Sequence, residues 1–227
     1  MVAGLTAAAA LGAKWIDDDV PVELIWPNHR APKGILTRND LLLDGESIDL
    51  GHLRVTTAER TAFDLARRGP VGQAVERLDA LARATSFATE DVMAMTASHP
   101  NSRGVRRIGQ VLDLVDAGAE SPQETWLRLL LIEAGFPRPE TQLPVLAPSG
   151  YPRYRLDMGW PELMIAVEYD GETHADTWRD DIVRSEYIAH VGWIHIRVVA
   201  GHRRPDIVAR VRRAWATRGG RLPSTLR

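Results

Sequence analysis

The segment that most constrains the fold is Met164–Val167, an almost wholly apolar run that leads into Glu168, Tyr169 and Asp170. Such a run is typical of a central strand that is covered on both faces of a sheet. Strand alternation predicts that Glu168 and Asp170 share a face, where two carboxylates repel each other and lose hydration. A divalent cation would offset that cost, because hard cations prefer carboxylate oxygens. The segment therefore predicts a buried strand with a candidate metal site at its end.

Helical and strand patterns alternate around this strand. The predicted order is a helix opened by Ser121-Pro122-Gln123-Glu124 and ended at Gly135, a strand Glu140–Leu146, a hairpin of Arg153–Trp160 with Leu163–Asp170, a helix Asp181–Val191, a strand Trp193–Val199 and a helix Pro205–Thr217. This alternation is typical of an α/β fold.

Residues 1–117, the first part of the chain, are predicted to form a mixed α+β scaffold without a recognisable group of catalytic residues. The boundary is expected near Gly118–Glu120, ahead of the next capped helix. The elements expected here are strands at Val22–Trp26 and Ile48–Val55, a helix from a Thr56/Glu59 capping box through Arg67, and helices at Val71–Ala84, Thr89–Ser98 and Arg103–Ala117.

Two further carboxylates are candidates for a shared site with Glu168. Asp157 lies eleven residues upstream, and a hairpin that turns near Pro161-Glu162 would bring it close to Glu168. Glu124 could reach the same place from its helix, although its spacing from Ser121 equally suits a capping box that needs no metal.

A simpler alternative remains open for the end of the strand. Asp170-Gly171 would then only form a turn, and Glu168 would pair with Arg155 or Arg197.

Four stretches of the second part carry motifs in a specific order and spacing. They are Ser121-Pro122-Gln123-Glu124-Thr125-Trp126-Leu127-Arg128, Leu156-Asp157-Met158-Gly159-Trp160, Ala166-Val167-Glu168-Tyr169-Asp170-Gly171 followed by His174, and Gly192-Trp193-Ile194-His195-Ile196-Arg197. This set resembles the very-short-patch-repair-type (Vsr-like) branch of the PD-(D/E)xK nuclease superfamily over about residues 118–216. The resemblance implies a restriction-endonuclease-like domain, at residues 118–217, with a central mixed sheet flanked by helices.

The resemblance also implies a metal site and its ligands. Asp157 matches the first metal-binding acid, Glu168 the second, and Glu124 the acid often supplied by the first helix. Mg²⁺ or Mn²⁺ would be the metal, and the Tyr169 carbonyl could supply another oxygen.

The superfamily pattern places a Lys two residues after the second acid, and here that position is Asp170. The chain has no Lys after Lys33. In the repair-type branch a nearby His assists, which makes His174 the candidate general base and Asp170 a candidate for orienting water.

Charge is distributed unevenly along the second part. Residues 120–196 hold six Arg and thirteen acids, whereas Arg197–Arg227 holds nine Arg and one acid. Such a basic stretch, ending in a tail at residues 218–227, predicts contacts with nucleic-acid phosphates, for which Arg210, Arg212 and Arg213 are candidates. Arg184 is a further candidate, and the alternative for it is surface pairing with Asp180 or Asp181.

Residues 1–117 resemble, more weakly, the region that follows the winged helix in AbiEi-like abortive-infection antitoxins. Most of that likeness lies in Thr56-Thr57-Ala58-Glu59-Arg60-Thr61-Ala62-Phe63-Asp64-Leu65-Ala66. An upstream winged helix is not expected, because the chain starts too late to contain one.

Three functions are weighed: a metal-dependent endonuclease acting on DNA, with repair or defence as its setting; a non-catalytic nucleic-acid-binding regulator, antitoxin-like, with a degenerate nuclease fold; and a protein-interaction module whose acids are structural. The chain has no Cys, so thiol catalysis and cysteine metal sites are excluded. No membrane segment, signal peptide or small-molecule cofactor is expected. The expected location is the cytoplasm, and a homodimer stays open.

Overall fold

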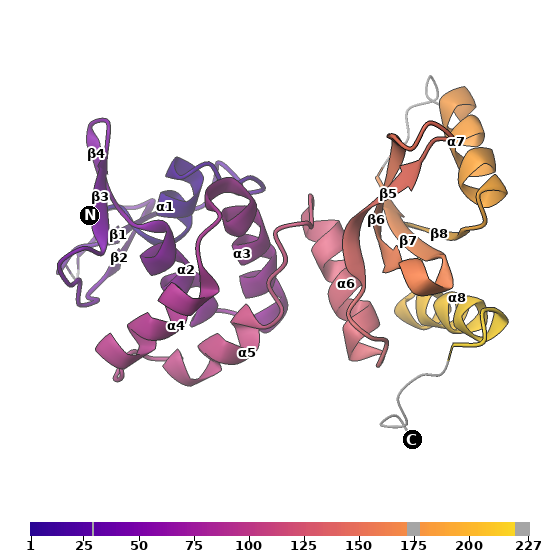
Figure 1. The fold of residues 1–227 in the computed structure, drawn as a ribbon. Helices are drawn as coiled ribbons and strands as arrows, with labels where there is room; N and C mark the ends of the chain where they lie inside the picture. The colour runs from indigo at the N-terminus through magenta and orange to yellow at the C-terminus, as the bar shows by residue number, and fades with distance from the viewer. Residues whose placement is uncertain (29, 172–177, 221–227) are drawn as a thin grey trace. The chain divides into compact units, whose positions relative to one another are not determined.

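The computed structural model describes residues 1–28, 30–171 and 178–220 (Figure 1). The chain divides into two compact units, Met1–Pro122 and Gln123–Arg227. Both units combine helices with strands, and the strand pairs are both parallel and antiparallel, so the α/β class predicted from the sequence is confirmed.

The first unit joins two small strand pairs to a group of helices. Its elements are α1 (Gly4–Ala10), β1 (Val22–Ile25), β2 (Ile35–Arg38), β3 (Ser47–Leu50), β4 (Leu53–Thr56), α2 (Ala58–Ala66), α3 (Val71–Thr85), α4 (Thr89–Ser98), η1 (Val105–Arg107) and α5 (Ile108–Leu112). Strand β1 pairs with β2 in parallel, and β3 pairs with β4 as an antiparallel hairpin.

Three predictions for this unit need correction. The segment Ile48–Val55 is not one strand, because Gly51 has a φ of 60° and turns the chain between β3 and β4. Helix α2 is capped by Thr57, whose hydroxyl accepts the Arg60 N–H, and not by Thr56. The predicted helix Arg103–Ala117 shortens to η1 and α5.

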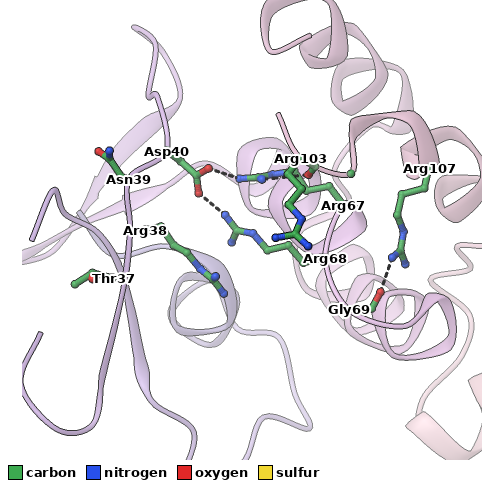
Figure 2. Close-up of a pocket in the computed structure, with 10 residues that line it drawn as sticks. Thr37, Arg38, Asn39, Asp40, Arg67, Arg68, Gly69, Arg103 and Arg107 are labelled. Carbon is green, nitrogen blue, oxygen red and sulfur yellow. Dashed lines mark hydrogen bonds and ion pairs between the residues drawn. The ribbon is translucent and has the colours of Figure 1, made fainter. Parts of the chain in front are cut away.

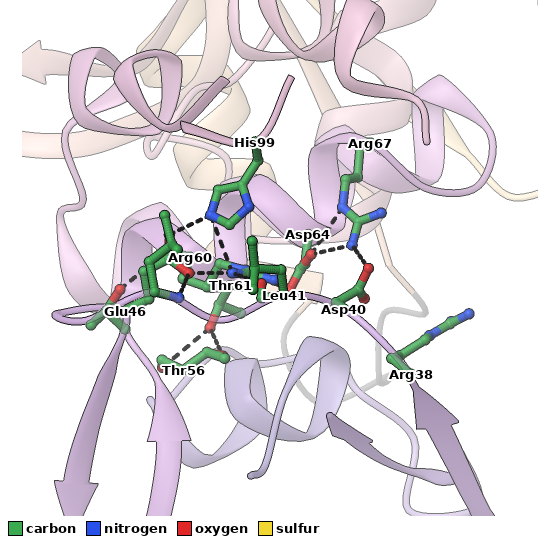
Figure 3. A network of polar contacts seen from close by, with 12 residues as sticks. Arg38, Asp40, Leu41, Glu46, Thr56, Arg60, Thr61, Asp64, Arg67 and His99 are labelled. Atoms are coloured by element: carbon green, nitrogen blue, oxygen red, sulfur yellow. Dashed lines mark hydrogen bonds and ion pairs between the residues drawn. The ribbon is translucent and has the colours of Figure 1, made fainter. Parts of the chain in front are cut away.

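Helix α2 is almost completely buried, and it carries charged residues as well as apolar ones. Arg60 is 1% exposed and Asp64 is not exposed at all. Figure 3 shows how partners surround them: Arg60 Nε donates to Asp64 at 3.2 Å, and Arg60 also bonds Glu46, which in turn contacts His99. Buried charges persist only when they are paired in this way.

The second unit is a four-stranded mixed sheet in the order β5-β6-β7-β8, with helices on both faces. Its elements are α6 (Pro122–Glu133), β5 (Glu140–Leu146), β6 (Pro152–Trp160), η2 (Pro161–Leu163), β7 (Ile165–Asp170), α7 (Trp178–His190), β8 (Ile194–Val199) and α8 (Arg204–Thr217). The pairs β5–β6 and β6–β7 are antiparallel, and β7–β8 is parallel.

Two apolar clusters place the helices around this sheet. Leu127 of α6 and Trp215 of α8 pack with Val167 in one cluster, whereas Ile188 of α7 packs with Ala166 in the other. Helices α6 and α8 thus cover one face of the sheet and α7 covers the other (Figure 1). Strand β7 is therefore covered on both sides, as its apolar run predicts. In the described part of the chain, no helix is both long and apolar enough to cross a bilayer.

Candidate carboxylate centre of the C-terminal unit

Asp157 and Glu168 lie on adjacent strands, at the point where β6 and β7 separate. Backbone pairing between the two strands extends from the pair Trp160–Ile165 to the pair Met158–Val167. In the same register, Asp157 would pair next with Glu168. Instead, Asp157 Oδ2 accepts the backbone N–H of Tyr169 at 3.0 Å. The side chain of one strand thus satisfies the backbone of the other beside Glu168.

Strand β6 also changes its orientation at Asp157. Leu156 packs on the α7 side of the sheet, but Met158, two residues on, packs on the side of α6 and α8. A regular strand would keep both on one face. Across from this position, Gln142 of β5 has a φ of 56°, a left-handed conformation that breaks the regular ladder. Asp157 therefore occupies a local distortion of the sheet.

Glu124 of α6 completes a group of three interacting carboxylates. Its side chain is buried, and Gln142 Nε2 lies 3.5 Å from its Oε2. Burial, followed by the charges of Glu168 and Glu124, raises the pKa of Asp157 from 3.8 to about 7. The Tyr169 N–H and Arg184 act in the opposite direction but do not outweigh these causes.

Glu168 is paired with basic side chains from α7 and β8. Arg184 Nη1 donates to Glu168 Oε2 at 2.9 Å, Arg184 Nη2 contacts the other oxygen, and His195 Nε2 contacts Oε2. Burial alone would raise the pKa of Glu168, but hydrogen bonds from His195 and Arg184 hold it below its ordinary value of 4.5. The ion pair involves neither of the partners foreseen for Glu168, which were Arg155 and Arg197.

Asp170 has a different cation beside it. Arg197 Nε donates to Asp170 Oδ2, and Arg197 Nη1 lies 2.7 Å from Asp181 Oδ2 of α7. Arg184 forms its pair with Glu168 rather than with the foreseen Asp180 or Asp181. Each acid at the end of β7 is thus neutralised by an arginine, which lowers the repulsion expected between Glu168 and Asp170.

The donor set fits a hard cation in part. The charge of Glu124 raises the pKa of Asp157, so the two carboxylates repel each other when both are ionised. Their oxygens are suitable ligands for a hard cation. Glu168, however, is directed to Arg184 and His195. Within residues 1–28, 30–171 and 178–220, no group of three or more His, Cys, Asp or Glu side chains is arranged to hold a metal ion. His174 lies outside the described residues.

The sequence analysis identifies neither His195 nor Arg184 as a partner of Glu168. A usable signal exists for His195: in the strand Ile194–Val199 it alternates with buried apolar residues, and β8 runs parallel beside β7. A carboxylate inside an apolar strand needs a polar partner from a neighbouring strand. Arg184 carries no comparable signal, because the packing of α7 on the sheet brings it to Glu168.

Three of the four arginines predicted to bind nucleic acid lie on α8, whereas Arg184 lies on α7 and pairs with Glu168. Arg212 and Arg213 are exposed and Arg210 is half-buried. Arg210 Nη1 lies 3.5 Å from His202 Nδ1, and Arg212 Nη2 lies 3.5 Å from the Ala134 carbonyl. No ion pair between these three arginines and a carboxylate occurs in the described part of the chain. Their charges therefore remain available to an anionic partner.

Two proteins of Mycobacterium tuberculosis, both described only as uncharacterized, are similar to this chain. They come from strains CDC 1551 and H37Rv, and each is 29% identical over 205 residues, which is 87% of this chain and 74% of the relative. The alignment thus extends over both units. No family model matches the chain, and no solved structure matches it.

Proposed function

We propose that the second unit is a divalent-cation-dependent endonuclease centre of the Vsr-like PD-(D/E)xK type, acting on DNA. One observation carries the proposal: Asp157 is buried beside Glu168 and Glu124, and burial, followed by the charges of these two acids, raises its pKa to about 7. Asp157 is therefore costly to ionise beside these two acids, and a bound Mg²⁺ or Mn²⁺ would reverse that cost. The mixed sheet with helices on both faces is compatible with a restriction-endonuclease-like fold.

The residues of the chain have distinct parts in this proposal. Asp157, Glu124 and the Tyr169 carbonyl would hold the cation together with Glu168. When bound, the cation supplies a more acidic water and neutralises charge on the phosphoryl oxygens. Asp157 is kept in place by the Tyr169 N–H. Asp170, at the position of the superfamily Lys, is held by Arg197, and His174 stays the proposed general base.

The basic helix α8 supports a nucleic-acid substrate. Arg210, Arg212 and Arg213, which pair with no carboxylate in the part of the chain that the structure describes, would hold the phosphate backbone and displace its counterions. A cytoplasmic role in DNA repair or defence, with the chain as a monomer or a homodimer, is the setting that we propose. The first unit would be an AbiEi-like scaffold joined to this centre.

A second function has its own supporting observation. Arg184 and His195 occupy both oxygens of Glu168, so the second acid is already neutralised by the protein. A degenerate nuclease fold that binds DNA without cutting it, as in a regulator, would be expected to replace the metal in this way. Cation binding separates the two functions.

The test is calorimetric titration of the full chain with Mn²⁺ and Mg²⁺, followed by cleavage assays on single-stranded, duplex, mismatched and branched DNA. The endonuclease proposal expects cation binding and cleavage, both lost in Asp157→Asn. Glu186→Gln on α7 is the matched control, because Glu186 is exposed, and it should behave like the wild type.

The conservative change keeps an acceptor for the Tyr169 N–H, so the fold should survive it. Wild-type chain that binds DNA but neither takes up Mn²⁺ nor cleaves any of the four substrates contradicts the endonuclease and supports the regulator.

A further inference from the structure

The first unit contains a pocket of about 780 Å³ whose wall is unusually basic (Figure 2). It lies where the end of β2 and the residues after it face the C-terminal end of α2 and the segment before α5. Its lining is Thr37, Arg38, Asn39, Asp40, Arg67, Arg68, Gly69, Arg103, Gly104 and Arg107. The lining thus contains five arginines but only one acid, Asp40. Ion pairs with acids outside the lining could neutralise some of these arginines.

The carboxylates around the pocket account for some of these arginines. Four acids are involved: Glu23, Asp40, Glu46 and Asp64. These four acids pair with four arginines, Arg38, Arg60, Arg67 and Arg68, in one connected network. Figure 3 shows the part of it around Arg60, Asp64 and Arg67. These four arginines are thus neutralised by the protein itself.

Arg103 and Arg107 are outside this balance. Within the described residues, neither guanidinium pairs with a carboxylate. Arg107 Nη1 donates to the Gly69 carbonyl, while its Nε and Nη2 are buried without a partner. Unpaired buried donors on a charged group are rare and costly. Arg103 and Arg107 thus leave two positive charges in the pocket wall that no described carboxylate neutralises, and an anion in the pocket would offset them.

Positive charge is also crowded on the α2 side of the pocket. Burial lowers the pKa of Arg68, and the charge of Arg67 lowers it further, so that it stays below its ordinary value although Asp64, Glu23 and Asp40 act the other way. An additional anion in the pocket would relieve this repulsion.

The segment that carries the two unpaired arginines is held closely against α2. Gly104 has a φ of 83°, and a Cβ there would lie 2.2 Å from the Arg67 carbonyl oxygen. Only glycine permits this approach. The Arg103 carbonyl accepts Arg67 Nη1 at 3.4 Å, and Figure 2 shows Arg107 reaching Gly69 beyond it. The arginines therefore lie on a fixed frame.

We propose that this pocket binds a phosphomonoester dianion carried by a nucleotide-sized small molecule, with Arg103 and Arg107 as its principal donors. Two guanidinium groups that pair with no described carboxylate match two negative charges, and the planar arginine fork suits phosphate oxygens. A volume of about 780 Å³ exceeds the needs of a free phosphate ion and falls within the usual range for small-molecule sites. The proposal is independent of the carboxylate centre in the second unit.

The test is calorimetric titration of the full chain at low salt and about pH 8, where a monoester carries two charges. The probes are inorganic phosphate, adenosine monophosphate, cyclic adenosine monophosphate and adenosine. The monophosphate should bind most tightly, inorganic phosphate more weakly, and the cyclic diester and the nucleoside at least about tenfold more weakly than the monophosphate, because each loses charge-assisted hydrogen bonds.

Arg103→Gln should weaken monophosphate binding about tenfold, and Arg103→Gln with Arg107→Gln about a hundredfold. Arg106→Gln is the matched control, because Arg106 lies beside Arg107 on η1, is exposed and does not line the pocket. This variant should bind the monophosphate as tightly as the wild type. Arg103→Gln should fold even if the double variant does not, because the one hydrogen bond described for Arg103 uses its backbone carbonyl and not its side chain. The single variant therefore keeps the test decisive.

Three results would overturn the proposal: no binding of either phosphate or monophosphate, equal affinity for monophosphate and nucleoside, or equal affinity of wild type and Arg103→Gln. Duplex DNA bound through Arg103 and Arg107 by a chain that ignores the monophosphate would also overturn it, and would assign the pocket to a polynucleotide backbone instead.

Discussion

Asp157 and Glu168 are neighbouring carboxylates with opposite behaviour, and their partners explain why. Glu168 accepts hydrogen bonds from Arg184 and His195, so its ionised form is favoured in spite of burial. Asp157 accepts a single backbone N–H and lies between two other acids, so its neutral form is favoured up to about pH 7. One buried site thus contains an acid that stays ionised and an acid that holds a proton.

This difference predicts how stability depends on pH in the metal-free chain. Because the pKa of Asp157 is raised from 3.8 to about 7, the folded state keeps a proton that the unfolded state releases. The free energy of unfolding should therefore fall as pH rises from about 4 to about 7, and level off above that range. Asp157→Asn cannot ionise, so it should not show this fall in the free energy of unfolding. Above pH 7 it should be more stable than the wild type, by at most about 4 kcal/mol.

Urea unfolding in the presence of a chelator, at about pH 5 and about pH 8, measures this effect. The difference in stability between Asp157→Asn and wild type should be larger at the higher pH. Glu162→Gln, at an exposed acid of the same unit, should show no such dependence. An equal shift at both pH values would contradict the raised pKa.

Pairing between β6 and β7 is the element-scale feature that positions the carboxylates. Gly159 pairs with Ala166, and a Cβ on Gly159 would lie 2.2 Å from the Ile165 carbonyl oxygen and 3.0 Å from the Ala166 Cα. Both obstacles are backbone atoms, which cannot rotate away as a side chain would. Close contact of the two strands therefore depends on glycine at this position.

Gly159→Ala should force β6 and β7 apart and destabilise the chain by about 1–3 kcal/mol, the usual cost of overpacking. Denaturant unfolding measures this change. Gly171→Ala is the control, since no described atom lies within 4 Å of a Cβ there, and it should change stability little. A Gly159→Ala chain as stable as wild type would show that the strands can adjust.

Across the whole molecule, net charge is only −2, but cations are concentrated in a few places. Arg210, Arg212 and Arg213 of α8 pair with no carboxylate among the described residues, and the same is true of Arg103 and Arg107 in the pocket of the first unit. Long-range attraction to polyanions depends on such local surfaces more than on net charge. The two units therefore carry separate candidate sites for phosphate groups, one on a helix surface and one in a pocket.

Reversal of Arg210, Arg212 and Arg213 to Glu should weaken DNA binding and reduce the slope of log affinity against log salt by up to about 3, because each lost phosphate contact removes about 0.9. Fluorescence anisotropy over a salt series measures both quantities.

The control for this triple variant is the same reversal at Arg30, Arg54 and Arg106, which are exposed in the first unit. It changes net charge equally and should leave the salt slope near that of the wild type. If both triple variants lose affinity to the same extent, net charge and not α8 governs binding.

The sequence alone determined most of the elements and the strand that organises the second unit. Local patterns were sufficient there: the apolar run of β7, the ranges of β5 and α4, and the approach of Asp157 to Glu168 through a hairpin all follow from alternation, helical periodicity and turn residues.

Tertiary structure alone decided the partners of the charged residues. Arg184 reaches Glu168 because α7 packs on the sheet, and His195 reaches it because β8 lies parallel beside β7. The buried network around Arg60 joins residues as far apart as Glu46 and His99, in a region where sequence patterns indicated only a scaffold. Long polar side chains can choose among many partners, and local propensity cannot rank them, because the desolvation that selects a partner exists only in the folded chain.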